Sequence, residues 1–245
     1  MNQDDTAVTT ILRIPGNWSD PRELLERIPD GCRLTPRGLV LPDETEIELI
    51  PVPPDDQFAE IFRSACRAPA RDDELSMVDS YSVNIILSGP GGSFPSALTM
   101  LQAGAAIIRA GGAGVFIDNS GLAHGGQDWI EMAEDGGQDA VSFAFVNIVR
   151  GRHELWTMGM QVLGLPELAM KHSDLDADAD TIIEVIRYLS QGEKPFGDGH
   201  VLADENGPRF RAVTTSSHTF DFGSPMHNPQ GRLQLVSMKE IAESN

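Results

Sequence analysis

The sequence predicts an α+β protein, in which helices pack on a mixed β-sheet and a small α+β unit precedes the main part. Residues 82–118 show the pattern of a strand, a helix and a second strand, which is typical of a βαβ unit with parallel strands. Residues 140–163 show the alternating pattern of a long β-hairpin, whose strands are antiparallel. Both strand directions in one part of the chain indicate a mixed sheet.

The βαβ unit is punctuated by glycine and proline. Residues 82–87 are a short apolar strand pattern, and the Gly-Pro-Gly-Gly stretch within 88–93 ends it. Ser93 is positioned to cap the next helix through its hydroxyl. That helix is indicated by apolar residues at helical spacing and a closing glycine pair: Phe94, Ala97, Leu98, Leu101, Ala105, Ile108 and Gly111-Gly112. Residues 115–117 then form the second strand, reached by a right-handed crossover.

Residues 1–68 form the predicted N-terminal α+β unit. Its strands are expected at 9–14, 38–41 and 45–50. Its helices are expected after the N-cap candidate Asp20 and over an apolar stripe at 58–66. The polar stretch 68–73 marks a boundary with a larger domain, 69–245, although the two units can also pack as a single domain.

Beyond the βαβ unit, the chain alternates between helical and strand patterns. A short helix is expected at 127–134, followed by hairpin strands at 140–149 and 153–163. Thr181 and Glu184 form a capping box that begins another helix, which ends at Gly192. The remainder, from residue 195, is predicted as short strands joined by turns.

The charge of the chain excludes several functions. The 245 residues carry a formal net charge of −19, and a surface this acidic repels phosphate backbones and anionic lipids. We therefore expect neither nucleic-acid nor membrane binding, and no apolar run reaches the ~20 residues of a membrane helix. The acidic first residues lack the features of a signal peptide, so a cytoplasmic location is expected. Cys32 and Cys66 suggest neither a disulfide nor a metal site.

Two polar, glycine-containing loops are expected to lie together. Parallel strands end at the same sheet edge, where ligands bind in open α/β sheets. The loops 88–93 and 118–129 follow the two strands of the βαβ unit, so this edge is the predicted site. Its candidate ligand-binding residues are Ser88, Gly91, Gly92, Ser93, Asn119 and Ser120. No phosphate-loop motif is present, so a tight strand-to-helix turn is the preferred interpretation of the first loop.

His124 is the candidate catalytic residue. It lies near Asp118 and Asp128 in the sequence, either of which could orient it as a general base, and Ser88 could supply a nucleophile. The alternative is that these polar side chains hydrogen-bond their own loop. The scattered histidines predict no metal site, and nothing predicts a cofactor.

A run of alternating aspartates, Asp174 to Asp180, resembles the start of a calcium loop. The pattern lacks the glycine and glutamate that such a loop requires at its sixth and twelfth positions. An acidic linker is the preferred interpretation.

Residues 75–215 resemble a bacterial protein family that is classified only as a domain of unknown function. The resemblance rests on the stretches 87–91 and 114–121, and on Thr157, Gly159 and the Gly164-Leu165-Pro166-Glu167 segment. It implies a bacterial cytoplasmic protein and brings no activity, cofactor or catalytic residue. It also draws attention to Glu167 as a ligand-binding candidate, because no local rule explains that residue.

The sequence therefore favours a non-enzymatic, acidic binding or interaction protein, whose partner is a small molecule or another protein. A hydrolase that uses His124 with Asp118 or Asp128 is the alternative. A basic protein partner, attracted by the negative charge, is a third hypothesis.

Overall fold

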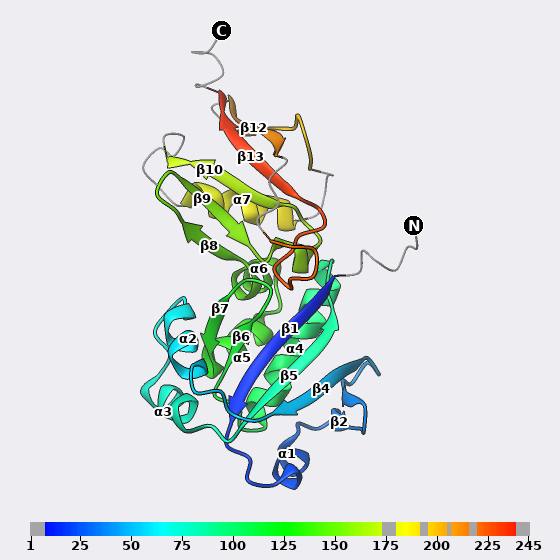
Figure 1. Ribbon diagram of the computed structural model, residues 1–245. Helices are drawn as coiled ribbons and strands as arrows, with labels where there is room; N and C mark the ends of the chain where they lie inside the picture. Colours follow the sequence, from blue (N-terminus) through cyan, green and yellow to red (C-terminus); the bar gives the residue numbers. More distant parts are fainter. Residues whose placement is uncertain (1–7, 173–179, 192–195, 205–206, 216–219, 239–245) are drawn as a thin grey trace.

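Strand β1 (Thr9–Gly16) is an interior strand of the first of two β-sheets in the computed structural model (Figure 1). It is hydrogen-bonded on both sides, antiparallel to β5 (Val83–Pro90) and antiparallel to β6 (Gly114–Ile117). The structure describes residues 8–172, 180–191, 196–204, 207–215 and 220–238. Within these residues the fold is α+β, as predicted.

The two sheets differ in where their strands come from along the chain. The first has the order β2 (Arg33–Leu34), β3 (Gly38–Val40), β4 (Glu46–Val52), β5, β1, β6, β7 (Leu122–Gly125). The second has the order β11 (Val201–Asp204), β12 (Gly207–Thr215), β13 (Arg232–Ser237), β10 (Glu167–Lys171), β9 (Glu154–Met158), β8 (Asn147–Arg150). The second sheet is mixed, because β10 and β13 are parallel while its other pairs are antiparallel.

Helices cover the sheets and fill the space between them (Figure 1). The helices are α1 (Pro21–Arg27), α2 (Phe58–Ala65), α3 (Asp72–Ser80), α4 (Phe94–Arg109), α5 (Gly126–Asp135), α6 (Gln138–Phe145) and α7 (Asp180–Ser190), with the 3-10 helix η2 (Met160–Leu163). Helices α4 and α5 pack on one face of the first sheet, and α2 and α3 pack on the other. Helix α6 lies between the two sheets and contacts α4, α5 and α7.

The predicted βαβ unit is present as β5–α4–β6. Since both strands are antiparallel to β1, they are parallel to each other, with β1 inserted between them. Ser93 caps α4 as predicted, because its hydroxyl accepts a hydrogen bond from the Ser96 amide at 3.2 Å. The unit is therefore a split crossover that is closed by the first strand of the chain.

The predicted boundary near residue 68 does not separate two sheets. Strands from both sides of it, β1 to β4 and β5 to β7, belong to the same first sheet. One hydrophobic core runs from Leu12 in β1 to Leu235 in β13, so it includes side chains of both sheets. The N-terminal unit thus packs into the larger one, which is the second arrangement that the sequence allowed.

Three segments differ from their sequence predictions. Residues 118–129 are a turn followed by β7 and the start of α5, because four buried residues between glycines still pair with β6. Residues 140–145 belong to α6 and are not a strand. The sequence analysis left residues 72–80 unassigned, and they form α3, whose first turn is acidic as helix dipoles favour.

The α6 error has a clear physical cause. The sequence alternates apolar and small residues there, which fits a strand, but Gly136 takes a left-handed conformation with φ 59° and the chain begins a new helix. In that helix Val141 and Phe145 are buried, whereas Phe143 is 50% exposed. The hairpin is correspondingly shorter than predicted and consists of β8 and β9 alone.

Gly159 ends β9 and turns the chain into η2. Its φ is 102°, and a Cβ at this position would lie 2.2 Å from the Phe145 carbonyl oxygen. Only glycine fits both the backbone angle and the space. In the part of the chain that the structure describes, no helix has both the length and the apolar character needed to cross a bilayer.

We predict that Gly159→Ala destabilises the protein by more than about 2 kcal/mol, because it adds a steric overlap to an unfavourable backbone angle. Gly199→Ala is the control. Gly199 also has a positive φ, of 79°, but nothing lies within 4 Å of a Cβ there. Urea unfolding of both variants measures the difference, and equal losses would show that the close approach to Phe145 is unimportant.

Candidate functional site

Parts of the two predicted loops, residues 91–93 and 118–121, lie at the same end of the first sheet, beside the start of β1. The Gly91 amide donates to the Val8 carbonyl at 2.9 Å, and the Ile11 amide donates to the Asn119 side chain at 2.9 Å. Both contacts are made to the beginning of β1. The convergence follows from the parallel direction of β5 and β6, as the sequence analysis assumed.

This edge is occupied by the second half of the molecule. The Gly92 amide donates to the Val162 carbonyl at 3.0 Å, and the Gln161 side chain donates to the Asn119 carbonyl at 3.2 Å. A Cβ on Gly164 would lie 2.3 Å from the Gly92 carbonyl oxygen. We call residues 89–93, 118–121 and 159–164 the junction. Its polar groups mainly join the two sheets.

The predicted ligand-binding residues are part of this packing. The Asn119 amide group donates to the carbonyls of Thr9 and Pro225 at 2.9 and 3.0 Å. Ser120 is fully buried, and its hydroxyl has no hydrogen-bond partner. The side-chain oxygen of Gln161, also fully buried, has no partner either. These two atoms are exceptions in an otherwise hydrogen-bonded junction.

Glu167 has a structural explanation that the sequence did not provide. One carboxylate oxygen accepts from the Gly159 and Met160 amides at 3.2 and 3.1 Å and from the Asn228 side chain at 3.0 Å. The other accepts from the Thr157 hydroxyl at 2.6 Å. Desolvation raises the pKa of Glu167, and these four donors oppose that rise. The carboxylate thus holds the start of η2 against β9 and β10.

His124 lies inside the core. It is 3% exposed, its ring packs beside Trp129 and Phe143, and its Nε2 lies 3.0 Å from the Ala144 carbonyl oxygen. Since a carbonyl only accepts, Nε2 carries the proton and donates it. Burial and the nearby positive charge of Arg67 lower the pKa of His124 to about 4, so the ring is neutral.

The proposed partners of His124 lie elsewhere. His124 is paired with Val115 in β6. Asp118 comes three residues after Val115, just past the end of β6, and side chains alternate between the faces of an extended chain. Asp118 is therefore directed to the opposite face, where it forms a two-point ion pair with Arg13 at 2.7 and 2.8 Å. Ser88 is paired with Ile11 on that same face.

Asp128, the other proposed partner, lies in the first turn of α5. Burial and the neighbouring Glu74 and Glu131 raise the pKa of its carboxyl group. No contact between Asp128 and His124 is found among the described residues. The structure therefore places neither Asp118 nor Asp128 where it could orient His124 as a general base.

A large cavity lies beside helix α6, the helix between the two sheets, and reaches the junction at Gly121. Its volume is about 750 Å³, within the range of small-molecule sites. Helix α6 forms the floor. The end of α2 and the turn before β7 form one wall, and β8 and α7 form the other. We call this space the waist cavity. Gly121 and Leu122 line it, so one of the two predicted loops contributes to it.

Arg67 is the polar centre of the waist cavity. It follows α2, and its guanidinium donates to the carbonyls of Phe143, at 2.9 Å, and Val146, and lies 4.3 Å from the centre of the Phe143 ring. No carboxylate pairs with it among the described residues. Burial lowers the pKa of Arg67 to about 10, so it is charged at neutral pH.

The structural explanation for Arg67 is that it caps the C-terminus of α6, where carbonyls carry partial negative charge. That role uses only part of the side chain. A guanidinium has five N–H groups, and the two carbonyls account for two of them. No hydrogen-bond acceptor for the remaining N–H groups is found among the described residues.

Other charged residues complete the lining. Arg150 at the end of β8 has no acidic partner in the described part of the chain. Arg187 on α7 is paired with Asp139 at 2.9 Å, and Asp135 accepts from the Gly137 amide at 2.8 Å. Cys66 also lines the cavity, and burial raises the pKa of its thiol, which disfavours the thiolate.

The sequence analysis missed this site because its walls come from segments that are distant in the chain. Arg67 stood beside the polar stretch that was interpreted as a boundary, and nothing local distinguishes it from a surface arginine. A second cavity of about 380 Å³, under α1, is lined by uncharged side chains only. No group of three or more potential metal ligands occurs in the described ranges. Asp174, Asp176 and Asp178 of the acidic run lie outside the described residues.

We predict that His124 makes stability depend on pH. Its pKa is lowered on folding, so its contribution is complete above about pH 6.5 and is lost as the pH falls toward 4. The full loss is on the order of 3 kcal/mol. His124→Gln keeps a side-chain donor without the titration. Urea unfolding at a series of pH values from 7 to 4 measures the free energy of unfolding of the wild type and of His124→Gln. We expect the difference between them to shrink as the pH falls. A difference that does not change with pH would contradict the lowered pKa of His124.

We predict that Glu167→Gln lowers the free energy of unfolding by about 1–3 kcal/mol, because the amide cannot accept from all four donors. Glu26→Gln is a matched control on the exposed side of α1, and we expect it to change stability by less than about 0.5 kcal/mol. Urea unfolding at pH 7 compares them. Equal effects would remove the structural role given to Glu167.

Comparison with known proteins gives no relative on which to base a function. No family model, curated protein or solved structure matches this chain. The resemblance to a family of unknown function therefore stays a hypothesis, and the functional argument depends on the geometry alone.

Proposed function

We propose that this chain is a non-enzymatic binding protein, whose ligand is a small organic anion held in the waist cavity. The observation that supports the proposal is Arg67, a half-buried guanidinium beside a cavity of about 750 Å³, without a carboxylate partner among the described residues. In a chain with 37 acidic and 18 basic residues, such a cation is unusual.

The proposal moves the site from the predicted sheet edge to the waist. The loops 88–93 and 118–129 were the expected partner surface, but their backbone groups are used at the junction. A charged group that is partly removed from water is stabilised by a partner of opposite charge. A ligand anion would supply that partner to Arg67, and Arg150 would strengthen the attraction.

No contact among the described residues favours the hydrolase alternative. His124 is neutral and donates to a backbone carbonyl, and Asp118 lies on the other face of the sheet. We also keep two proposals from the sequence, a bacterial origin and a cytoplasmic location. The second is supported by the two free cysteines, Cys32 and Cys66.

We predict that small organic anions raise the melting temperature of the protein, and that Arg67→Met weakens their binding by about tenfold or more, because charge-assisted hydrogen bonds are lost. Arg67→Met also removes the cap of α6, so Arg150→Ala serves as a second variant that leaves the cap intact. Isothermal titration at low and high salt measures both variants.

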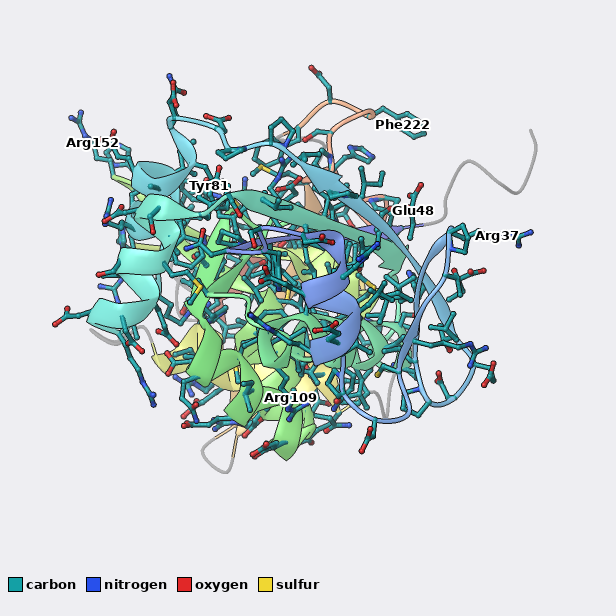
Figure 2. The ribbon with its side chains drawn as sticks, turned by 90° about the horizontal axis from the view of Figure 1, so that it is seen from below. Arg37, Glu48, Tyr81, Arg109, Arg152 and Phe222 are labelled. Carbon is teal, nitrogen blue, oxygen red and sulfur yellow. The ribbon has the colours of Figure 1, made fainter. Side chains whose placement is uncertain are left out.

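Arg152→Ala is the matched control. Arg152 lies in the turn after β8, two residues from Arg150, and its side chain projects away from the molecule (Figure 2). The proposal requires unchanged anion binding in this variant. Equal binding by the wild type, Arg67→Met and Arg150→Ala would place the anions elsewhere and overturn it.

A further inference from the structure

The waist cavity has the charge and the lining of a site for one particular class of anion. We infer that its ligand is an amphipathic monocarboxylate, with one carboxylate on Arg67 and an apolar body along α6 and α7. This inference rests on the proposed function and narrows it to one chemical class.

The charge of the lining favours a single negative charge. Three guanidinium groups, Arg67, Arg150 and Arg187, face two carboxylates, Asp135 and Asp139. The pairing of Arg187 with Asp139 leaves an excess of one positive charge. A monoanion neutralises this excess. A dianion or polyphosphate would bring more negative charge than this excess neutralises. The surplus would be repelled by Asp135 and Asp139 and by a protein whose net charge is −19.

The geometry at Arg67 favours a carboxylate. Two of its N–H groups are held by the carbonyls at the end of α6, which fixes the plane of the guanidinium. A carboxylate can accept two hydrogen bonds side by side from the groups that remain. A bulkier tetrahedral anion gains no second cation from Arg187, because that guanidinium is already paired with Asp139.

The rest of the lining requires an apolar body. Apolar side chains come from every wall, and two large ones, Phe143 and Ile183, are 50% and 41% exposed. The Phe143 ring already stacks on the Arg67 guanidinium, so the apolar surface begins where the carboxylate would end. Covering this surface removes it from water, which is favourable.

The size of the cavity supports the same conclusion. At about 750 Å³ it could hold roughly 25 water molecules at ~30 Å³ each, far more than an inorganic anion displaces. Small-molecule sites of this size enclose most of a ligand's surface. An aliphatic or aryl chain attached to the carboxylate would fill the space that the anion alone leaves open.

Isothermal titration of the full chain with a matched set of compounds tests this inference. The probes are hexanoate, decanoate, 4-phenylbutanoate, 1-decanol, inorganic phosphate and a nucleoside triphosphate. We expect affinity to rise about threefold to fourfold for each added methylene between hexanoate and decanoate. We also expect 1-decanol to bind at least tenfold more weakly than decanoate.

Variants locate the two halves of the ligand. Arg67→Met is expected to reduce decanoate affinity to that of 1-decanol. Ile183→Ser, on the exposed side of α7, is expected to weaken decanoate more than hexanoate. Arg152→Ala is expected to leave all the affinities unchanged.

The outcomes separate this inference from the proposed function. Suppose that phosphate or the triphosphate binds and requires Arg67, whereas neither decanoate nor 4-phenylbutanoate binds in this way. The monocarboxylate ligand class is then rejected, while the proposed anion site is retained. If decanoate and 1-decanol bind equally and Arg67→Met changes neither, the inference is also wrong. If no probe depends on Arg67 or Arg150, both the ligand class and the proposed function are rejected.

Discussion

The carboxylate of Glu167 is the contact on which the relation between the two sheets depends. It accepts hydrogen bonds from a hydroxyl, two backbone amides and a side-chain amide at the start of η2. Helix η2 then lies against the edge of the first sheet, where Val162 accepts from Gly92 and Gln161 donates to Asn119. Strand β8 pairs with β9, which carries Thr157, so the wall of the waist cavity that β8 forms belongs to the same sheet as this carboxylate.

Much of the fold could be predicted in segments where apolar residues repeat with the spacing of a single type of secondary structure, either helix or strand. The helix of the βαβ unit has sixteen residues with apolar positions at helical spacing, and β1 and β5 are long apolar strands. The failures are short segments. In α6, eight residues satisfy both the strand and the helix pattern, and a left-handed glycine before them decides the outcome. In β7, four residues between glycines form a strand only because β6 is adjacent.

The site could be predicted only in part, for a related reason. Parallel strand ends do bring 88–93 and 118–121 together, and that geometric deduction was sound. Whether an edge is open or filled depends on segments far away in the chain, here η2 and the residues around Pro225. Strand alternation also separates Asp118 from His124, which no spacing in the sequence reveals without the register of β6 and β7. The waist cavity combines four distant segments and carries no local pattern.

The insertion of β1 between β5 and β6 has a consequence for the order of folding. Strand β1 needs two neighbours that are synthesised about 70 and 100 residues after it. Until both arrive, its two rows of backbone groups have no permanent partners, and pairing with the wrong strand is the main hazard. Loops of this length close slowly, since contacts between distant residues carry an entropic cost before they gain any stability. The backbone edges of β1 are therefore protected only once β5 and β6 have both been synthesised and have paired with it.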